Sequence, residues 1–399
     1  MLGAPGPPAR PGGDTTGDVG LLDYYRQFEG MSEEEVNEGL REEAAERRRK
    51  ALTRLDNLDL AQTTWPELPH PRIVNAITYV ARRGLNSYPH LRGTDLRTEL
   101  AQRHGVEPSR LILGNGAAEL LSSATRALIG PGQQLLTLWP SYPLYPLMAR
   151  RAHGQAVRVE GGVDGLLEAA QAPEVRAIAL ASPNDPTGEL LESAELDRLL
   201  SGLPEGVAVL LDESLVDFAD AQPADSSLAL LERHPRLLVF RTFSKAWGLA
   251  GLRIGYVIGS PGSGDLLAEL DPDLGVSEVS QAGALEALHS CTELVADRVR
   301  TICEERPRLT AALRSHGFDV TDSQANFVWA AHPELSGAEL AARLEQAGVL
   351  IAPGDALGEP RHARIAIRSK QATERLIDAI EKAGQLSAGA PEGSQPEPA

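Results

Sequence analysis

Aromatic residues are scarce in this chain of 399 residues, because phenylalanine, tryptophan and tyrosine together make up only 4% of it. Hydrophobic residues of all kinds reach 42%, so we still expect a large core, built mainly from leucine, alanine and valine. Cysteine is scarcer still. The two cysteines, Cys291 and Cys303, exclude a disulfide framework and give no zinc signature.

Positive charge is also in deficit, with a formal net charge of −18 at pH 7. Nucleic-acid binding needs a basic surface, so this balance argues against it. No apolar run approaches the length of a membrane span, and the first residues lack the basic start and apolar segment of a signal peptide. We therefore expect a cytoplasmic enzyme with no nucleic-acid partner, no membrane partner and no metal.

The two ends of the chain differ in composition from its middle. Residues 1–20 and 386–399 are rich in proline and glycine or carry repeated prolines, which predicts disordered tails. Ser32 followed by Glu35 is a capping box and predicts a helix start. We expect the segment 21–70 to contain that helix and to join the smaller of two domains.

Short apolar runs alternate with helical stretches through the middle of the chain. Seven runs lie at 111–113, 135–138, 156–159, 177–180, 207–211, 237–240 and 254–258. Helices between such runs predict an α/β fold with a mainly parallel sheet covered on both faces. Later runs at 326–329, 349–351 and 363–367 predict a smaller sheet. We expect a large domain at 71–288 and a smaller α/β domain at 289–385.

Lys245 lies in a loop between two of the apolar runs, with hydroxyls at Thr242 and Ser244 and a second cation at Arg253. This combination suits a phosphorylated carbonyl cofactor, since the amine can form a Schiff base while hydroxyls and arginine hold the phosphate. An ordinary exposed lysine after a strand is the alternative for Ser244 and Lys245 alone.

The segment 114–119 follows an apolar run and opens a helix. Backbone amides of Gly116, Ala117 and Ala118 at a helix start are typical of a phosphate site. A dinucleotide site is the alternative, but Glu119 replaces its third glycine and the expected acid about 20 residues later is missing.

Two further residues are candidates for chemistry. Asp212 ends a buried apolar run, where a carboxylate is costly unless it is paired. Tyr142 lies in the segment 140–145 after another run. Taken singly, Asp212 could cap a helix and Tyr142 could belong to a proline-rich turn.

The string 241–256, together with these motifs in this order, resembles the fold-type-I pyridoxal-phosphate-dependent aminotransferases of class I/II, in the histidinol-phosphate aminotransferase-like group. The resemblance covers roughly residues 56–380. It implies a seven-stranded sheet, pyridoxal 5'-phosphate as cofactor and a homodimer with shared active sites.

The resemblance also implies a role for each motif residue. Lys245 would form the Schiff base and carry the proton, Asp212 would keep the ring nitrogen protonated, and Tyr142 would stack on the ring. Arg364 would bind the substrate α-carboxylate. The cofactor phosphate would be held by residues from three segments and a second subunit: Gly116, Ala117, Ala118, Thr242, Ser244, Arg253, and Tyr88 of the neighbouring subunit.

Three positions depart from the family pattern. Asp185 stands where the family has an asparagine that donates to the cofactor's phenolic oxygen, and Leu215 where it has a tyrosine. We expect Asp185 beside the cofactor; the alternative is a shifted turn in which Asn184 faces it. Ala352 stands where histidinol-phosphate enzymes have an arginine for the substrate phosphate.

The resulting expectation is an aminotransferase that moves an amino group between an unphosphorylated amino acid, or amine, and a 2-oxo acid. The alternative is a decarboxylase, lyase or oxidase that uses the same lysine, motivated by Asp185 and Leu215. A non-enzymatic regulator would need a DNA-binding domain, and residues 1–60 show no basic helix-turn-helix pattern.

Overall fold

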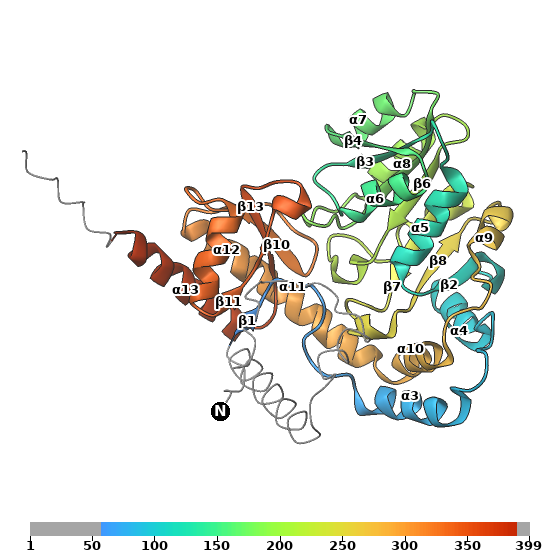
Figure 1. Cartoon of the computed structure of the whole chain (residues 1–399), viewed down its shortest axis with the longest axis horizontal. Coiled ribbons are helices and arrows are strands. Elements are labelled where there is room, and N and C mark those ends of the chain that lie inside the picture. The colour runs from blue at the N-terminus through green and yellow to red at the C-terminus, as the bar shows by residue number, and fades with distance from the viewer. Residues whose placement is uncertain (1–56, 389–399) are drawn as a thin grey trace, which may run out of the picture. The chain divides into compact units, whose positions relative to one another are not determined.

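The computed structural model describes residues 57–388, drawn in colour in Figure 1. The predicted tail at 1–20, the capping box at Ser32 with its helix, and residues 389–399 lie outside the described residues. At the other end, helix α13 (Lys370–Ala388) continues past residue 386, where the sequence predicted a disordered tail to begin.

All seven predicted apolar runs belong to one seven-stranded sheet. Its strands are β2 (Leu111–Gly114), β3 (Gln134–Leu138), β4 (Gln155–Val159), β5 (Val175–Ala181), β6 (Ala208–Asp212), β7 (Leu237–Thr242) and β8 (Gly255–Gly259). They are arranged in the order β2-β8-β7-β6-β5-β3-β4. Strand β8 runs antiparallel to both its neighbours, and every other pair is parallel. The predicted α/β fold with a mainly parallel sheet is confirmed.

Helices cover both faces of this sheet, as Figure 1 shows. One face packs against α5 (Ala117–Leu128), α6 (Leu144–Arg151) and α9 (Gly264–Leu270). The other packs against α4 (Thr94–His104), α7 (Gly162–Ala169), α8 (Ser193–Gly202) and α10 (Glu278–Ser290), and α3 (Pro71–Gly84) packs on α10. In β6, the side chain of Leu210 packs on the face covered by α5, α6 and α9, and the side chains of Val209 and Leu211 pack on the other face. A strand buried on both faces must be continuously apolar, which is why the runs were recognisable.

The direction of the strands brings distant motifs to one edge. Strands β2, β3, β5, β6 and β7 are mutually parallel, so their carboxyl ends meet there. Strand β8 begins at the same edge because it runs the other way. Ligands of open α/β sheets bind outside the carboxyl ends of the strands.

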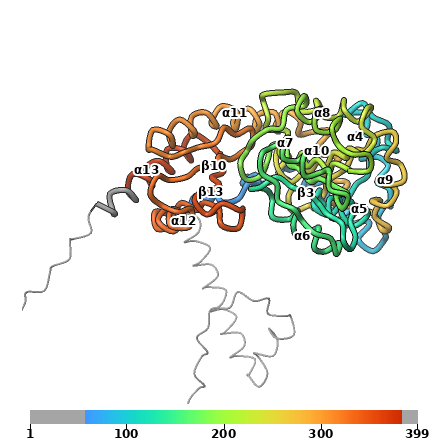
Figure 2. Tube along the Cα trace, turned by 90° about the horizontal axis from the view of Figure 1, so that it is seen from above, coloured from blue at the N-terminus to red at the C-terminus, as the bar shows by residue number. Residues whose placement is uncertain are grey.

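A smaller antiparallel sheet follows, in the order β12 (Ala352–Pro353), β13 (His362–Ala366), β10 (Phe327–Ala331) and β9 (Asp319–Val320). It packs with α11 (Thr292–Ser315), α12 (Gly337–Gln346) and α13, and these elements gather in orange and red in Figures 1 and 2. Strand β1 (Leu58–Asp59) pairs with β11 (Val349–Leu350). Residues 57–388 include no helix with the length and apolar character needed to cross a bilayer.

Candidate active site

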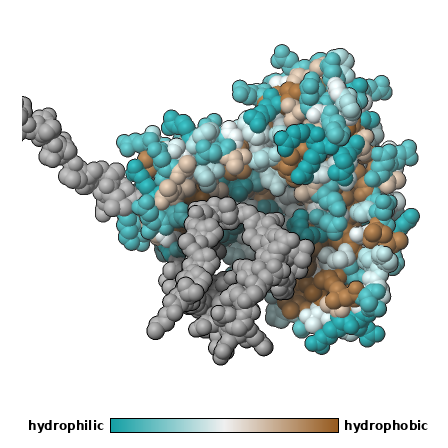
Figure 3. Space-filling model, in the orientation of Figure 1, coloured by the Kyte–Doolittle hydropathy of each residue, from teal (hydrophilic) through white to brown (hydrophobic). Residues whose placement is uncertain are grey.

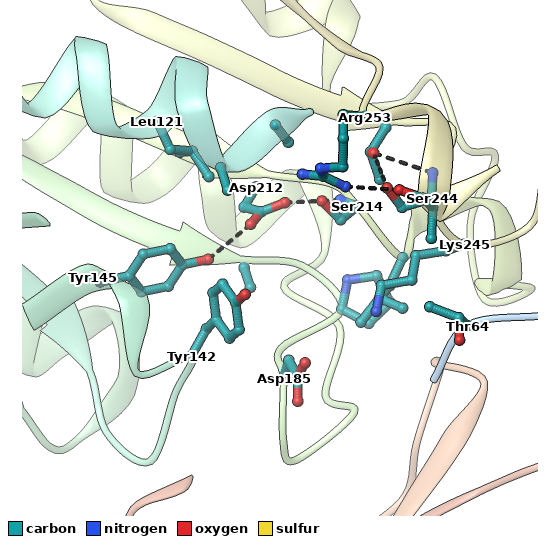
Figure 4. A pocket seen from close by; sticks show the side chains of 17 residues that line it. Thr64, Leu121, Tyr142, Tyr145, Asp185, Asp212, Ser214, Ser244, Lys245 and Arg253 are labelled. Atoms are coloured by element: carbon teal, nitrogen blue, oxygen red, sulfur yellow. Dashed lines mark hydrogen bonds between the residues drawn. The ribbon is translucent and has the colours of Figure 1, made fainter. Parts of the chain in front are cut away.

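A cavity of about 220 Å³ lies at the carboxyl edge of the large sheet. Nine of the predicted site residues line it: Ala117, Ala118, Tyr142, Asp185, Asp212, Thr242, Ser244, Lys245 and Arg253. Figure 4 shows Asp212 and Arg253 on one side of this cavity and Asp185 on the other, with Tyr142 and Lys245 between them. Leu215 also lines it and is buried.

Three predicted site residues are not among the described residues that line the cavity. Gly116 immediately precedes α5 and serves as its N-cap. Arg364 lies in β13, and its guanidinium forms an ion pair with Asp185, which does line the cavity. Tyr88 lies elsewhere and is 80% exposed, so it does not contribute to the cavity of its own chain.

Lys245 follows strand β7, and its side chain points into the cavity. Its Nζ donates to Oγ1 of Thr63 at 2.5 Å. Burial lowers the pKa of Lys245, and the charge of Asp185 partly opposes that shift. A lower pKa leaves more of the amine neutral, and a neutral amine is the form that attacks a carbonyl.

Asp212 ends β6 as a buried carboxylate, and no described residue forms an ion pair with it. It accepts hydrogen bonds from the hydroxyl of Tyr145 at 3.2 Å and from the amide of Ser214 at 2.9 Å. Burial raises the pKa of Asp212, and the charge of Lys245 is a smaller, opposing influence. A buried carboxylate aimed at a cavity suits a cationic group of a bound molecule, such as a protonated ring nitrogen.

The part of the cavity next to Arg253 is built for an anion. Helix α5 begins here with Gly116 at φ 86°, and its first amides are free of intrahelical partners. A Cβ on Gly116 would collide with the guanidinium of Arg253, and a Cβ on Gly255 would lie 2.5 Å from the amide nitrogen of Ala117. The two glycines therefore allow backbone amides and guanidinium to converge on one point.

Two hydroxyls complete this anion site. Thr242 donates to Ser244 at 2.9 Å, and the amide of Ser244 donates back to Thr242 at 3.2 Å. Arg253 adopts a left-handed conformation with φ 49°, and its Nη1 donates to the carbonyl of Ala250 at 3.0 Å. Amides, hydroxyls and one guanidinium form the donor set that a phosphate monoester needs.

Tyr142 lines the cavity, and its ring meets that of Tyr145 edge-on at 5.8 Å between centroids. Burial raises the pKa of both hydroxyls, so both stay protonated. The sequence singled out Tyr142 and assigned Tyr145 no role in the site. Tyr145 is fully buried, yet its hydroxyl is the direct partner of Asp212.

The loop after β5 places Asp185, not Asn184, in the cavity. Asn184 is tied to a neighbouring loop: it accepts from Ser141 at 2.9 Å and donates to the carbonyl of Pro140 at 3.1 Å. Asp185 is 9% exposed and accepts from Nη1 of Arg364 at 2.5 Å. The alternative of a shifted turn, with Asp185 in solvent, is wrong.

One segment of the site was not predicted. Residues 61–63, just after β1, cross the lysine side of the cavity and accept hydrogen bonds from three cationic side chains. Arg364 donates to the carbonyl of residue 61, Arg368 to that of residue 62 and Lys245 to the hydroxyl of residue 63. Asn326 donates to the carbonyl of Thr63 at 2.8 Å and fixes the segment.

Known proteins of similar sequence belong to one family of enzymes. The family described as "Aminotransferase class I and II" matches residues 56–380. Histidinol-phosphate aminotransferase 1 of Nitrosococcus oceani is 34% identical over 328 residues, which cover 81% of this chain and 87% of that protein. An aromatic amino acid aminotransferase of Streptomyces coelicolor is 35% identical over 293 residues, covering 72% and 81%.

Among solved structures, the chain is similar to the histidinol-phosphate aminotransferase of Sinorhizobium meliloti in complex with pyridoxal-5'-phosphate. The TM-score is 0.74 at 24% identity, and the likeness covers 85% of this chain and 94% of that one. At that identity it is a likeness of fold. The family match and the sequence relatives go further: the chain belongs to the aminotransferase class I and II family.

Proposed function

We propose that the protein is a pyridoxal 5'-phosphate-dependent aminotransferase that moves an amino group from an unphosphorylated amino acid or amine to a 2-oxo acid. One observation carries this proposal: Lys245, the buried carboxylate of Asp212 and the anion site at the start of α5 line one cavity. An amine, an acid and a phosphate site in one cavity match the three parts of this cofactor. The family membership agrees with it.

Each group of residues has a part to play in holding the cofactor. The amides of Ala117 and Ala118, the hydroxyl of Ser244 and the guanidinium of Arg253 would hold its phosphate. Asp212 would bind the ring nitrogen and favour its protonated form, oriented by Tyr145. Tyr142 would cover one face of the ring. When bound, the cofactor supplies a carbonyl for amines and a ring that accepts electrons.

Lys245 is the one group in the described cavity suited to moving the substrate proton. Burial lowers its pKa, so more of the amine is in the neutral form that can accept a proton and return it. Thr63 holds Nζ on the side of the cavity formed by the segment 61–63. Arg364 would bind a substrate carboxylate once Asp185 no longer occupies its guanidinium.

The sheet register supports an unphosphorylated substrate. Ala352 lies directly opposite Arg364 between β12 and β13, and its methyl group offers no cation to a phosphate. Charge-assisted hydrogen bonds of that kind contribute roughly 1.5–3 kcal/mol each. We therefore infer that histidinol phosphate is not the preferred donor.

The test is a panel of amino donors, including histidinol phosphate, offered to the purified protein with a 2-oxo acid. Keto acid or aldehyde, ammonia and carbon dioxide are measured together. Amino transfer predicts a new amino acid in stoichiometric amount without ammonia or carbon dioxide. Release of carbon dioxide or ammonia as the main product would instead establish the decarboxylase, lyase or oxidase alternative.

We also infer a homodimer with shared active sites. Large apolar side chains are exposed on α3 and the segment after it: Val74, Tyr79, Leu85, Tyr88 and Leu91, with Leu274 exposed as well. Figure 3 shows apolar residues gathered on the surface over α3. Contiguous exposed apolar surface marks an interaction site. The exposed ring of Tyr88 would then reach the cofactor phosphate of the neighbouring subunit.

Sedimentation velocity and subunit mixing test the dimer. Leu85→Glu should give monomers, while Gln171→Glu, an exposed position in the turn after α7, should leave the dimer intact. If sites are shared, mixing inactive Tyr88→Ala with inactive Lys245→Ala subunits restores activity, because one hybrid site receives both native residues. No recovery in a mixture shown to contain hybrids would overturn the shared site.

The domain division at residue 288 and the cytoplasmic location stay predictions from the sequence.

A further inference from the structure

Asp185 and Arg364 form a buried ion pair on the side of the cavity that faces Asp212 and Arg253. The carboxylate accepts from Nη1 at 2.5 Å, and the two side chains are 13% and 14% exposed. Within the described residues, Asp185 lines the cavity and Arg364 does not. The carboxylate therefore lies between the guanidinium and any molecule that enters.

The rest of the guanidinium is also committed or enclosed. Nη2 of Arg364 donates to the carbonyl of Ala61 at 3.4 Å, and Nε is buried with no hydrogen-bond partner among residues 57–388. The ring of Phe327 lies under the guanidinium at 5.4 Å from its centroid. While Asp185 stays in place, a substrate carboxylate has to compete with it for this arginine.

An incoming carboxylate meets an unfavourable balance of charge. It must either share Arg364 with Asp185 or displace Asp185, which then remains in the cavity as an unpaired buried carboxylate. Both routes bring two negative charges close together in a partly buried site. An amine that carries no carboxylate on its reacting carbon meets neither obstacle, and its ammonium form is attracted to Asp185.

We propose that Asp185 is an internal substitute for the substrate α-carboxylate, so that the favoured amino donor is a primary amine or amino alcohol without one. This inference rests on the proposed function and names its donor class. The donor is oxidised to an aldehyde or ketone as it gives up its amino group. The 2-oxo acid is reduced to an amino acid as it receives that group.

The same pair determines what happens to the acceptor. A 2-oxo acid brings its own carboxylate into the cavity, so its half-reaction is the one that Asp185 opposes. Replacing Asp185 by asparagine keeps the shape and removes the charge. The replacement should therefore speed the reaction with both the 2-oxo acid and the α-amino acids, while the reaction with carboxylate-free donors should not become faster.

Single-turnover kinetics of the holoenzyme test this with donors matched except for the α-carboxylate. Histidinol is compared with histidine, and 2-phenylethylamine with phenylalanine, by the absorbance change of the cofactor. The quantity compared is the single-turnover rate constant divided by the dissociation constant of the donor. In the native protein it should be at least tenfold higher for the carboxylate-free member of each pair. In Asp185→Asn that preference should shift toward the amino acid by two to three powers of ten. The upper value corresponds to about 4 kcal/mol, for two unit charges 4 Å apart at an effective dielectric of 20.

Glu189→Gln is the matched control, because it removes one negative charge from an exposed position in the same loop. It should leave the donor preference unchanged. Because a structural role of Asp185 would slow all donors alike, an inverted preference is specific to the proposed role. The native comparison needs no variant, so it still decides the matter if Asp185→Asn does not fold.

The outcomes separate the two proposals. If amino acids outpace their carboxylate-free partners in the native protein, the donor class is wrong although amino transfer stands. A preference that Asp185→Asn leaves unchanged also overturns the role of Asp185. If the cofactor binds and no donor of either kind yields a carbonyl product, the proposed amino transfer itself fails.

Discussion

Nζ of Lys245 donates a 2.5 Å hydrogen bond to the hydroxyl of Thr63, a residue 182 positions earlier in the chain. Thr63 is only 5% exposed, and its carbonyl is held by Asn326 at 2.8 Å. The bond joins the segment after β1 to the loop after β7. The amine of the site is thus positioned by residues from both ends of the described chain.

Replacing Thr63 by valine should destabilise the protein without cofactor by about 1–3 kcal/mol, because a buried donor loses its acceptor. Urea unfolding measures this. In a Lys245→Met background the same replacement should be nearly neutral, since the donor is gone. An equal cost in both backgrounds would show that Thr63 acts through packing rather than through this bond.

Lys245 should also make stability depend on pH. Burial lowers its pKa below the ordinary 10.5, so between the lowered value and 10.5 the unfolded chain binds more protons than the folded one. Lys245 therefore destabilises the fold fully below its lowered pKa, and this effect is relieved as pH rises toward 10.5. Unfolding free energies across this range should rise less steeply in Lys245→Met without cofactor. Parallel pH profiles would contradict the lowered pKa.

The sequence predicted those parts of the fold and site that depend on local patterns. The inner strands of the large sheet were recognisable because they are apolar on both faces, and Asp212 was conspicuous as a charge at the end of one of them. Lys245, Thr242, Ser244 and Arg253 were found because a single loop carries them all.

Contacts between distant segments left no such pattern. Arg364 reaches Asp185 across 179 positions, and Tyr145 reaches Asp212 across 67. Whether a buried tyrosine meets a carboxylate is decided by how α6 packs on the sheet. The sequence recognised Asp185 as a departure, and only the fold shows that its partner is Arg364.

Asp212→Asn should weaken cofactor binding by roughly ten- to a hundredfold, because a hydrogen bond to a charged group contributes about 1.5–3 kcal/mol. Equilibrium dialysis against pyridoxal 5'-phosphate measures the change. Asp164→Asn is the control, since that carboxylate is 82% exposed on α7 and pairs only at the surface. Unchanged affinity for the cofactor in Asp212→Asn would show that Asp212 does not bind the ring nitrogen.

Gly255→Ala should disturb the anion site at the start of α5. Its Cβ would lie 2.5 Å from the amide nitrogen of Ala117 and 2.8 Å from the carbonyl of Arg241, both backbone atoms. Overpacking of this kind costs about 1–3 kcal/mol. Thermal unfolding should show the loss, and inorganic phosphate should bind more weakly. Gly264→Ala has open space around its Cβ and should change neither. If the two variants had the same thermal stability and the same affinity for phosphate, the close packing of Gly255 against the start of α5 would not be needed for the anion site.

The role of Lys245 is decided by whether the cofactor becomes covalently attached to it. The chain has only four lysines, Lys50, Lys245, Lys370 and Lys382, so borohydride reduction of the holoenzyme followed by peptide mapping gives an unambiguous answer. One pyridoxyl group per chain is expected, on Lys245, and none in Lys245→Ala. A label on any of the other three lysines, or none in a protein that binds the cofactor, would contradict that role.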